Sequence, residues 1–418
     1  MIARALAAVA AATLLLAPVA IANDYSDTAY LQFDADNIAR TLQRQTYQVT
    51  TPEYLLAAAD TFPGSWLAGW QRQAREAGEG RLYVTGGSVL PGGNVGDPET
   101  YRANEAHRTE VEYLDRDGAR IIGNVWPCDG GAAPCPGVVV TTGSIQVTQH
   151  MYDWLARALQ LDGYTVFTFD VRGQGQSEQT TQNPQDEANF VNGTIDALRF
   201  FLSDANPLRA TVDETRLALV GHSLGARAVS VVQQCSTSYP GTDASACGGE
   251  TWPILAVVAY DSLSGDVTPV VPAFDHRADG YFINAVPTPT APDPDEHVDA
   301  AYRTWRDAGV DACTITVRGG THAEWSDIPG IVSATRYGSL QSAYYTAAFL
   351  DTYVKSDDAA FAALQDGPRA VGGEPWSATL FSGKYRSACH VRGWDAPDLR
   401  AYAGVAAVGD WAALNSES

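Results

Sequence analysis

A serine between two glycines is the residue of this chain best suited to act as a nucleophile. Residues Gly221–Gly225 read G-H-S-L-G, with Ser223 at the centre. The apolar run Leu217–Val220 precedes this motif, and helix-forming residues follow it. The context predicts a strained strand-to-helix turn that exposes the serine hydroxyl, since glycines let the backbone pass where a Cβ would collide. We predict that Ser223 attacks a carbonyl carbon and that the backbone amide of Leu224 stabilises the oxyanion.

A serine hydroxyl needs a general base, and His322 is the histidine that the sequence places best for this task. Residues Thr314–Val317 predict a strand, and a glycine-containing turn leads from this strand to His322. Residues that follow parallel strands gather at the carboxyl edge of a sheet, where active sites form. We therefore predict His322 as the base. The other nearby histidine, His222, is predicted to pack beside the serine rather than to act as a second base.

Three aspartates compete for the role of the acid that orients the base. Asp261 ends the predicted strand Leu255–Tyr260, whereas Asp275 and Asp279 follow the predicted strand Val270–Phe274. Each would lie at the carboxyl edge of the sheet. The residues themselves leave all three open.

The elements that must position these side chains alternate between strands and helices, which predicts a mostly parallel sheet with helices on both faces. The predicted strands are Thr109–Tyr113, Arg120–Trp126, Gly137–Thr142, Thr165–Asp170, Arg216–Val220, Leu255–Tyr260, Val270–Phe274 and Thr314–Val317, of which the first two form an antiparallel pair. The predicted helices are Met151–Leu161, Phe190–Leu202, Val298–Ala308 and Leu340–Lys355.

One link departs from this pattern. Residues Asp261–Pro269 have no helical pattern and are fewer than the dozen or so that a parallel crossover normally needs. Either this crossover is unusually short or the predicted strand limits are wrong by a few residues.

Two further motifs resemble the α/β-hydrolase superfamily. Residues Val139–Ser144 read V-V-T-T-G-S and look like its strand and oxyanion turn, and Asp170–Ser177 is similar to its D-x-R-G-x-G-x-S turn. The resemblance covers residues 109–355. Within the superfamily the chain looks most like secreted bacterial esterases, lipases and polyester hydrolases, in which a G-H-S-L-G turn is common. It implies an α/β-hydrolase fold, here preceded by an N-terminal helical extension.

The resemblance also implies roles for individual residues. It implies that the backbone amides of Leu224 and Ser144 hold the oxyanion. It places the acid several residues beyond a proline, in the loop after the strand that precedes the last one. Asp279 fits that position best, ahead of Asp261 and Asp275.

The amino terminus has the pattern of a secretory signal peptide that is cleaved after Ala22. The chain is therefore predicted to reach an oxidising compartment, where an even number of cysteines favours disulfides. Proximity in the sequence pairs Cys128 with Cys135 and Cys235 with Cys247, which leaves Cys313 for Cys389. We predict a secreted monomer with a signal peptide at 1–22, the helical extension at 23–105, a hydrolase core at 106–356 and a C-terminal extension packed on the core at 357–418.

Charge and motifs exclude several classes of partner. The net charge of -22 argues against nucleic acid and anionic membranes. No segment after the signal peptide is apolar enough to span a membrane. Asp293, Asp295, Glu296 and Asp299 form an acidic loop that we predict to be solvated rather than a calcium site. No cofactor and no metal are predicted.

These observations predict hydrolysis of a carboxylic ester through an acyl-enzyme, with Ser223, His322 and Asp279 as the catalytic residues. An amide or peptide bond is the alternative substrate, because the same residues would cleave it. A secreted, non-catalytic binding protein on a hydrolase fold is the alternative outside enzymes, and the presence of all three residue types in order argues against it.

Overall fold

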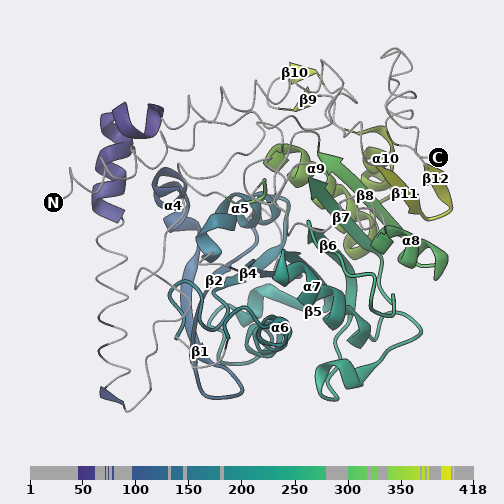
Figure 1. Ribbon diagram of the computed structural model, residues 1–418, viewed down its shortest axis with the longest axis horizontal. Helices are drawn as coiled ribbons and strands as arrows, with labels where there is room; N and C mark the ends of the chain where they lie inside the picture. Colours follow the sequence, from purple (N-terminus) through teal and green to yellow (C-terminus); the bar gives the residue numbers. More distant parts are fainter. Residues whose placement is uncertain are drawn as a thin grey trace, which may run out of the picture.

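A ten-stranded sheet organises the part of the chain that the structure describes (Figure 1). The computed structural model describes residues 46–61, 71, 74, 78–79, 97–129, 133–144, 148–178, 183–278, 300–317, 322, 324–326, 338–367, 370–371, 374–375, 387–396 and 399. The strands of the sheet are β1 (Thr109–Leu114), β2 (Arg120–Trp126), β3 (Cys135–Thr141), β4 (Thr165–Phe169), β5 (Val212–His222), β6 (Ile254–Tyr260), β7 (Ala273–Ala278), β8 (Ala312–Val317), β11 (Ala388–Val391) and β12 (Trp394–Ala396).

Their order in the sheet is β1-β2-β4-β3-β5-β6-β7-β8-β11-β12. The strands from β4 to β8 run parallel to one another. Two strands at each edge run antiparallel to their neighbours. A mostly parallel sheet of this kind, with helices on its faces, confirms the predicted α/β-hydrolase fold.

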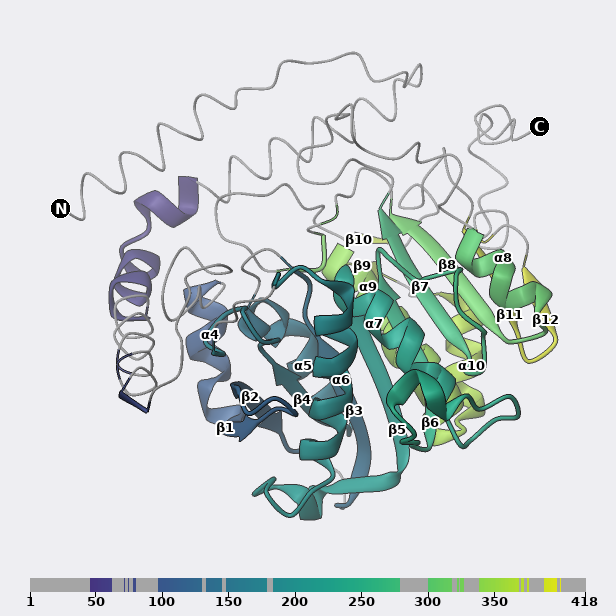
Figure 2. The ribbon, with the colours of Figure 1, turned by 60° about the horizontal axis from the view of Figure 1, so that its bottom comes forward.

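Helices cover both faces of the sheet (Figure 2). Residues of α6 (Glu187–Phe201), α7 (Leu224–Val232) and α8 (Ala300–Asp307) belong to one buried apolar cluster. Residues of α5 (Asp153–Leu161), α9 (Gly338–Leu350) and α10 (Asp358–Asp366) belong to the other. The shorter α4 (Pro98–Asn104) lies beside α5 (Figure 1).

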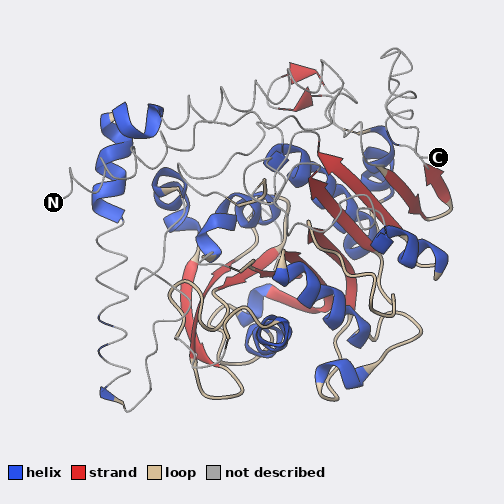
Figure 3. Cartoon of the chain, in the orientation of Figure 1, coloured by secondary structure: helices blue, strands red, loops and turns tan. Residues whose placement is uncertain are grey.

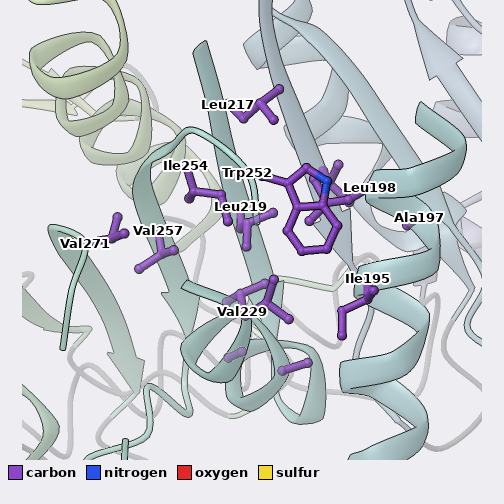
Figure 4. Packing of buried hydrophobic residues seen from close by; sticks show 14 of the residues in the cluster. Ile195, Ala197, Leu198, Leu217, Leu219, Val229, Trp252, Ile254, Val257 and Val271 are labelled. Carbon is purple, nitrogen blue, oxygen red and sulfur yellow. The ribbon is translucent and has the colours of Figure 1, made fainter. Parts of the chain in front are cut away.

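The valines of β3 show why a central strand must be apolar along its whole length. Val139 packs in the first cluster, while Val138 and Val140 pack in the second. Successive side chains point to opposite faces, and both faces are buried here. Figure 4 shows the first cluster, in which Leu219 of β5 and Val229 of α7 lie near each other.

The strand β7 begins later than the sequence predicts, and the cause is hydrogen bonding to a side chain that is distant in the sequence. Val270 and Val271 are buried and apolar, so they read as strand residues. Their backbone N–H groups instead donate to the Gln233 side chain, each over 2.9 Å. Pro272 follows and has no N–H, so the strand starts at Ala273. The link 261–272 contains no helix, yet β6 and β7 are parallel.

The strand β11 (Ala388–Val391) was not predicted, because an apolar run of four residues interrupted by a histidine is too short to mark a strand. It pairs with β8 so that Cys389 lies opposite Cys313, and the two form a disulfide. The predicted disulfides Cys128–Cys135 and Cys235–Cys247 are present as well.

Within the described residues, no helix is long and apolar enough to cross a bilayer. The predicted signal peptide, residues 1–22, lies outside the described part of the chain. Of the predicted N-terminal extension, the helical residues include 46–50, 52–61 and those of α4 (Figure 3).

Candidate active site

Ser223 occupies the sharp turn that the sequence predicts. It lies between the last residue of β5, His222, and the first residue of α7, with φ 56° and ψ -122°. A positive φ is uncommon for a residue other than glycine and costs conformational energy. A Cβ at Gly221 would lie 2.2 Å from the carbonyl oxygen of Gly225, and one at Gly225 would lie 2.3 Å from that of Thr141. Both motif glycines are therefore required sterically.

The two predicted oxyanion donors belong to segments that meet at this turn. Leu224 is the first residue of α7, so its amide is at the positive end of the helix. Ser144 is half-buried and follows Gly143 just after β3. Gly143 packs against Ser223, because a Cβ at Gly143 would lie 3.2 Å from the Cβ of Ser223.

His322 pairs with an acid, and that acid is Asp261. The Nδ1 atom of His322 lies 2.5 Å from Oδ2 of Asp261. The two side chains are 15% and 13% exposed. Asp261 follows β6 directly, and its backbone N–H donates to the carbonyl of His276 over 2.7 Å. The sequence placed the acid at Asp279, which lies outside the described residues, so the contact with His322 revises the candidate acid to Asp261.

Asp275, the third candidate, is a residue of β7 rather than of the loop after it. Its side chain is 2% exposed and contacts Arg277, with 3.5 Å between Oδ2 and a guanidinium nitrogen. Burial raises the pKa of Asp275 to about 7, and the charge of Asp261 adds to the rise while Arg277 opposes it. Because β7 extends to Ala278, Asp275 lies inside the strand and is buried, instead of following the strand end.

The charge of Asp261 is stabilised by its surroundings. Burial raises its pKa, but the hydrogen bond with His322 and the positive charges nearby outweigh burial, so that its pKa lies below the ordinary value. The Arg277 guanidinium contributes one of these charges, with Nε 3.6 Å from Oδ1 of Asp261. Arg277 carries no sequence signal for this role, since only the pairing of β6 with β7 brings it to Asp261.

Backbone contacts hold the serine, the acid and the histidine at one edge of the sheet. In the parallel pair of β5 and β6, His222 lies opposite Tyr260. The N–H of Ser223 donates to the carbonyl of Tyr260 over 3.0 Å, and Asp261 is the next residue. The Nε2 atom of His222 lies 2.8 Å from the carbonyl oxygen of His322. The three residues thus follow strands whose carboxyl ends meet.

His222 packs beside the serine turn, as the sequence predicts. It is 3% exposed, and its ring centroid lies 4.8 Å from that of His322. Burial lowers the pKa of His222 to about 3, and the neighbouring His322 adds to the decrease. Its Nδ1 atom lies 2.6 Å from the hydroxyl of Tyr152, a contact for which the sequence holds no signal.

No group of three or more potential metal ligands occurs among the described residues. The acidic loop with Asp293, Asp295, Glu296 and Asp299 lies outside them, so its predicted lack of calcium remains a prediction.

Comparisons with known proteins agree with the fold. Residues 139–232 match the family described as the alpha/beta hydrolase fold, a stretch that begins within β3 and includes β4, β5 and the serine turn. The chain is also similar to thiohydrolase aneE of Aspergillus aculeatus, with 30% identity over 92 residues. That similarity covers 22% of this chain and 28% of the relative, so the match spans little more than a quarter of the relative's length.

Proposed function

We propose that this chain, whose residues 139–232 match the alpha/beta hydrolase fold, is a serine hydrolase that cleaves carboxylic esters. The observation that carries the proposal is the position of Ser223 on a strained turn, at the sheet edge where Asp261 holds His322. This combination of nucleophile, base and orienting acid is what acyl transfer through a serine requires.

In the first half of the proposed reaction, Oγ of Ser223 attacks the ester carbonyl carbon, and Nε2 of His322 takes the hydroxyl proton. Nδ1–H of His322 donates to Asp261, which fixes the tautomer and stabilises the imidazolium. The amides of Leu224 and Ser144 stabilise the oxyanion. When the C–O bond breaks, His322 returns the proton to the leaving oxygen, which releases the alcohol and leaves an acyl-enzyme.

In the second half, water attacks the acyl carbonyl while Nε2 of His322 accepts a proton from it. The tetrahedral intermediate collapses and expels Oγ of Ser223, which regains its proton from His322. The carboxylic acid leaves and the enzyme returns to its starting state. No group besides substrate and water is consumed.

A thioester is the second candidate substrate, because the similar Aspergillus protein is named a thiohydrolase. The same steps would apply with sulfur as the leaving atom. A thiol has a pKa near 8.5 and leaves as a thiolate more readily than an alcohol leaves as an alkoxide. Cleavage of a thioester would therefore depend less on proton return from His322 than cleavage of an ester.

We also propose that the protein is secreted. Support comes from the three disulfides, which form and persist in oxidising compartments. Fractionation of the native host should place the protein outside the cytoplasm, without residues 1–22. Recovery of the intact chain with reduced cysteines from the cytoplasm would contradict this.

The function is tested by labelling with a fluorophosphonate probe, together with turnover of p-nitrophenyl esters, of acyl thioesters of matched chain length and of peptides. We expect the wild type to be labelled and Ser223→Ala to be neither labelled nor active. Ser245→Ala is the matched control, because Ser245 is exposed and bonds only locally to Asp243. Labelling that persists in Ser223→Ala would refute the assignment, and turnover of peptides but not esters would redirect it to amide bonds.

A further inference from the structure

Tyr152 and His222 form a buried chain of hydrogen bonds between two parts of the candidate site. The backbone N–H of Gly143 donates to the Tyr152 hydroxyl over 3.1 Å. That hydroxyl lies 2.6 Å from Nδ1 of His222. Nε2 of His222 lies 2.8 Å from the carbonyl oxygen of His322. Tyr152 is fully buried and His222 is 3% exposed, so water does not compete for the first two of these bonds.

The direction of every bond in this chain follows from its ends. A carbonyl oxygen only accepts, so Nε2 of His222 carries the proton that it donates to His322. In a neutral ring Nδ1 is then an acceptor, and the Tyr152 hydroxyl donates to it. The hydroxyl oxygen still accepts from Gly143, whose N–H can only donate. Burial lowers the pKa of His222 to about 3, in agreement with a neutral ring.

We propose that Tyr152 and His222 are positioning residues, which hold the backbone of His322 in register with the turn that carries Ser144. This inference rests on the proposed function. His322 is then attached at two points: its carbonyl oxygen is held by His222, and its Nδ1 atom is held by Asp261. Two attachments restrict rotation of the ring and aim Nε2, whereas the contact with Asp261 alone leaves the ring free to swing.

The hydrogen bonds of Tyr152 and His222 also connect to residues next to the other groups that the reaction needs. His222 is the residue before Ser223, and Gly143 is the residue before Ser144. Nucleophile, base and oxyanion turn are thus tied to one rigid set of hydrogen bonds. Small displacements of such groups are costly, since a misplacement of about 1 Å can slow a reaction on the order of 100-fold.

Neutral His222 suits this position for a second reason. Its ring centroid lies 4.8 Å from that of His322, which becomes positively charged during each half of the proposed reaction. A positive charge on His222 would oppose that step, whereas a buried neutral ring does not.

Substitutions at Tyr152 and His222 test the proposal. Tyr152→Phe removes the hydroxyl and keeps the ring. His222→Gln carries an amide that can donate to the His322 carbonyl and accept from Tyr152, whereas His222→Leu can do neither. Tyr164→Phe is the control. Tyr164 is also fully buried, and its hydroxyl donates to Asp351 over 2.7 Å. It directly precedes β4, so it lies at the amino-terminal ends of the parallel strands, away from the candidate site.

Turnover is measured per fluorophosphonate-labelled site, so that a variant that folds poorly is counted only where it has folded. We expect kcat to fall about 10-fold in Tyr152→Phe and on the order of 100-fold in His222→Leu, with KM little changed. His222→Gln should recover most of the loss, and Tyr164→Phe should match the wild type. Equal kcat in Tyr152→Phe and Tyr164→Phe, or in His222→Leu and His222→Gln, would overturn the positioning role.

A second measurement does not depend on turnover. In protein with ¹⁵N-labelled histidine, His222 should show an unprotonated Nδ1 and a slowly exchanging Nε2 proton from pH 8 down to pH 5. The Nδ1 signal should shift in Tyr152→Phe. A protonated Nδ1 at neutral pH would break the inferred chain, whereas a wild type that the probe fails to label would refute the serine hydrolase itself.

Discussion

The Nδ1 atom of His322 and the Oδ2 atom of Asp261 are 2.5 Å apart, although 61 residues separate them in the sequence. Asp261 stands at the end of β6, next to the strand that presents Ser223. The candidate acid therefore reaches His322 from the strand adjacent to the one that precedes Ser223, one strand earlier than the superfamily resemblance implies.

Asp261→Asn should lower kcat for ester hydrolysis about 1,000-fold or more, while the protein stays folded. The asparagine amide can donate to Nδ1 of His322, which favours the tautomer that cannot accept the serine proton at Nε2. Steady-state kinetics of Asp261→Asn and Asp279→Asn, side by side, check this. Near-normal activity of Asp261→Asn together with an inactive Asp279→Asn would return the acid to Asp279.

Gly225→Ala should be destabilised by about 3 kcal/mol or more and should lose labelling by fluorophosphonate, because its Cβ would overlap the backbone of Thr141. Gly193→Ala is the control. Gly193 lies inside α6, and a Cβ there would meet its nearest atom at 3.5 Å, an ordinary contact. That change should stabilise the helix by about 0.5 to 1 kcal/mol. Urea unfolding measures both, and equal stability of the two variants would argue against a constrained turn.

Each disulfide can be removed by substitution of both its cysteines with alanine. The loss of stability should be larger for a disulfide that closes a longer loop. The Cys313–Cys389 pair spans 76 residues, against 12 for Cys235–Cys247 and 7 for Cys128–Cys135. Loop-closure entropy gives about 4 kcal/mol for the longest loop and about 2 kcal/mol for the shortest. Thermal unfolding of the three double variants checks the order, and the largest loss at Cys128–Cys135 would contradict it.

Asp275→Asn should become more stabilising, relative to the wild type, as pH rises from about 4 to about 8. Burial raises the pKa of Asp275 to about 7 in the folded protein, while the unfolded chain releases the proton near pH 4. The stabilisation from protonated Asp275 is therefore complete below about pH 4 and is lost as pH rises through about 7.

Asparagine does not titrate, so the difference in unfolding free energy between the variant and the wild type isolates this group. We expect that difference to change by about 3 kcal/mol between pH 4.5 and pH 8. Urea unfolding at several pH values measures it. A difference that moves in the opposite direction would mean that Asp275 is ionised in the folded protein below pH 4.

Local sequence was informative wherever the structural requirement is itself local. The turn at Ser223 depends on two glycines and on the residues of the strand and helix next to them. All of these lie within the ten-residue segment Leu217–Ala226. The parallel strands are buried on both faces, so their apolar runs mark them directly. Where a long-range hydrogen bond intervened, as Gln233 does at Val270 and Val271, the predicted strand limits were wrong.

By itself, then, the sequence determined the turn at Ser223, the sheet class and the disulfide pairs, because residues near one another in the sequence dictate the turn, the strands and two of the pairs, and the third pair takes the cysteines that remain. The partner of His322, the charge at Arg277 and the chain from Gly143 to His322 were decided only by the tertiary structure. Each of these contacts joins segments that are brought together by strand order and loop path. Which of several acidic side chains reaches a given imidazole depends on that path, and no local pattern encodes it.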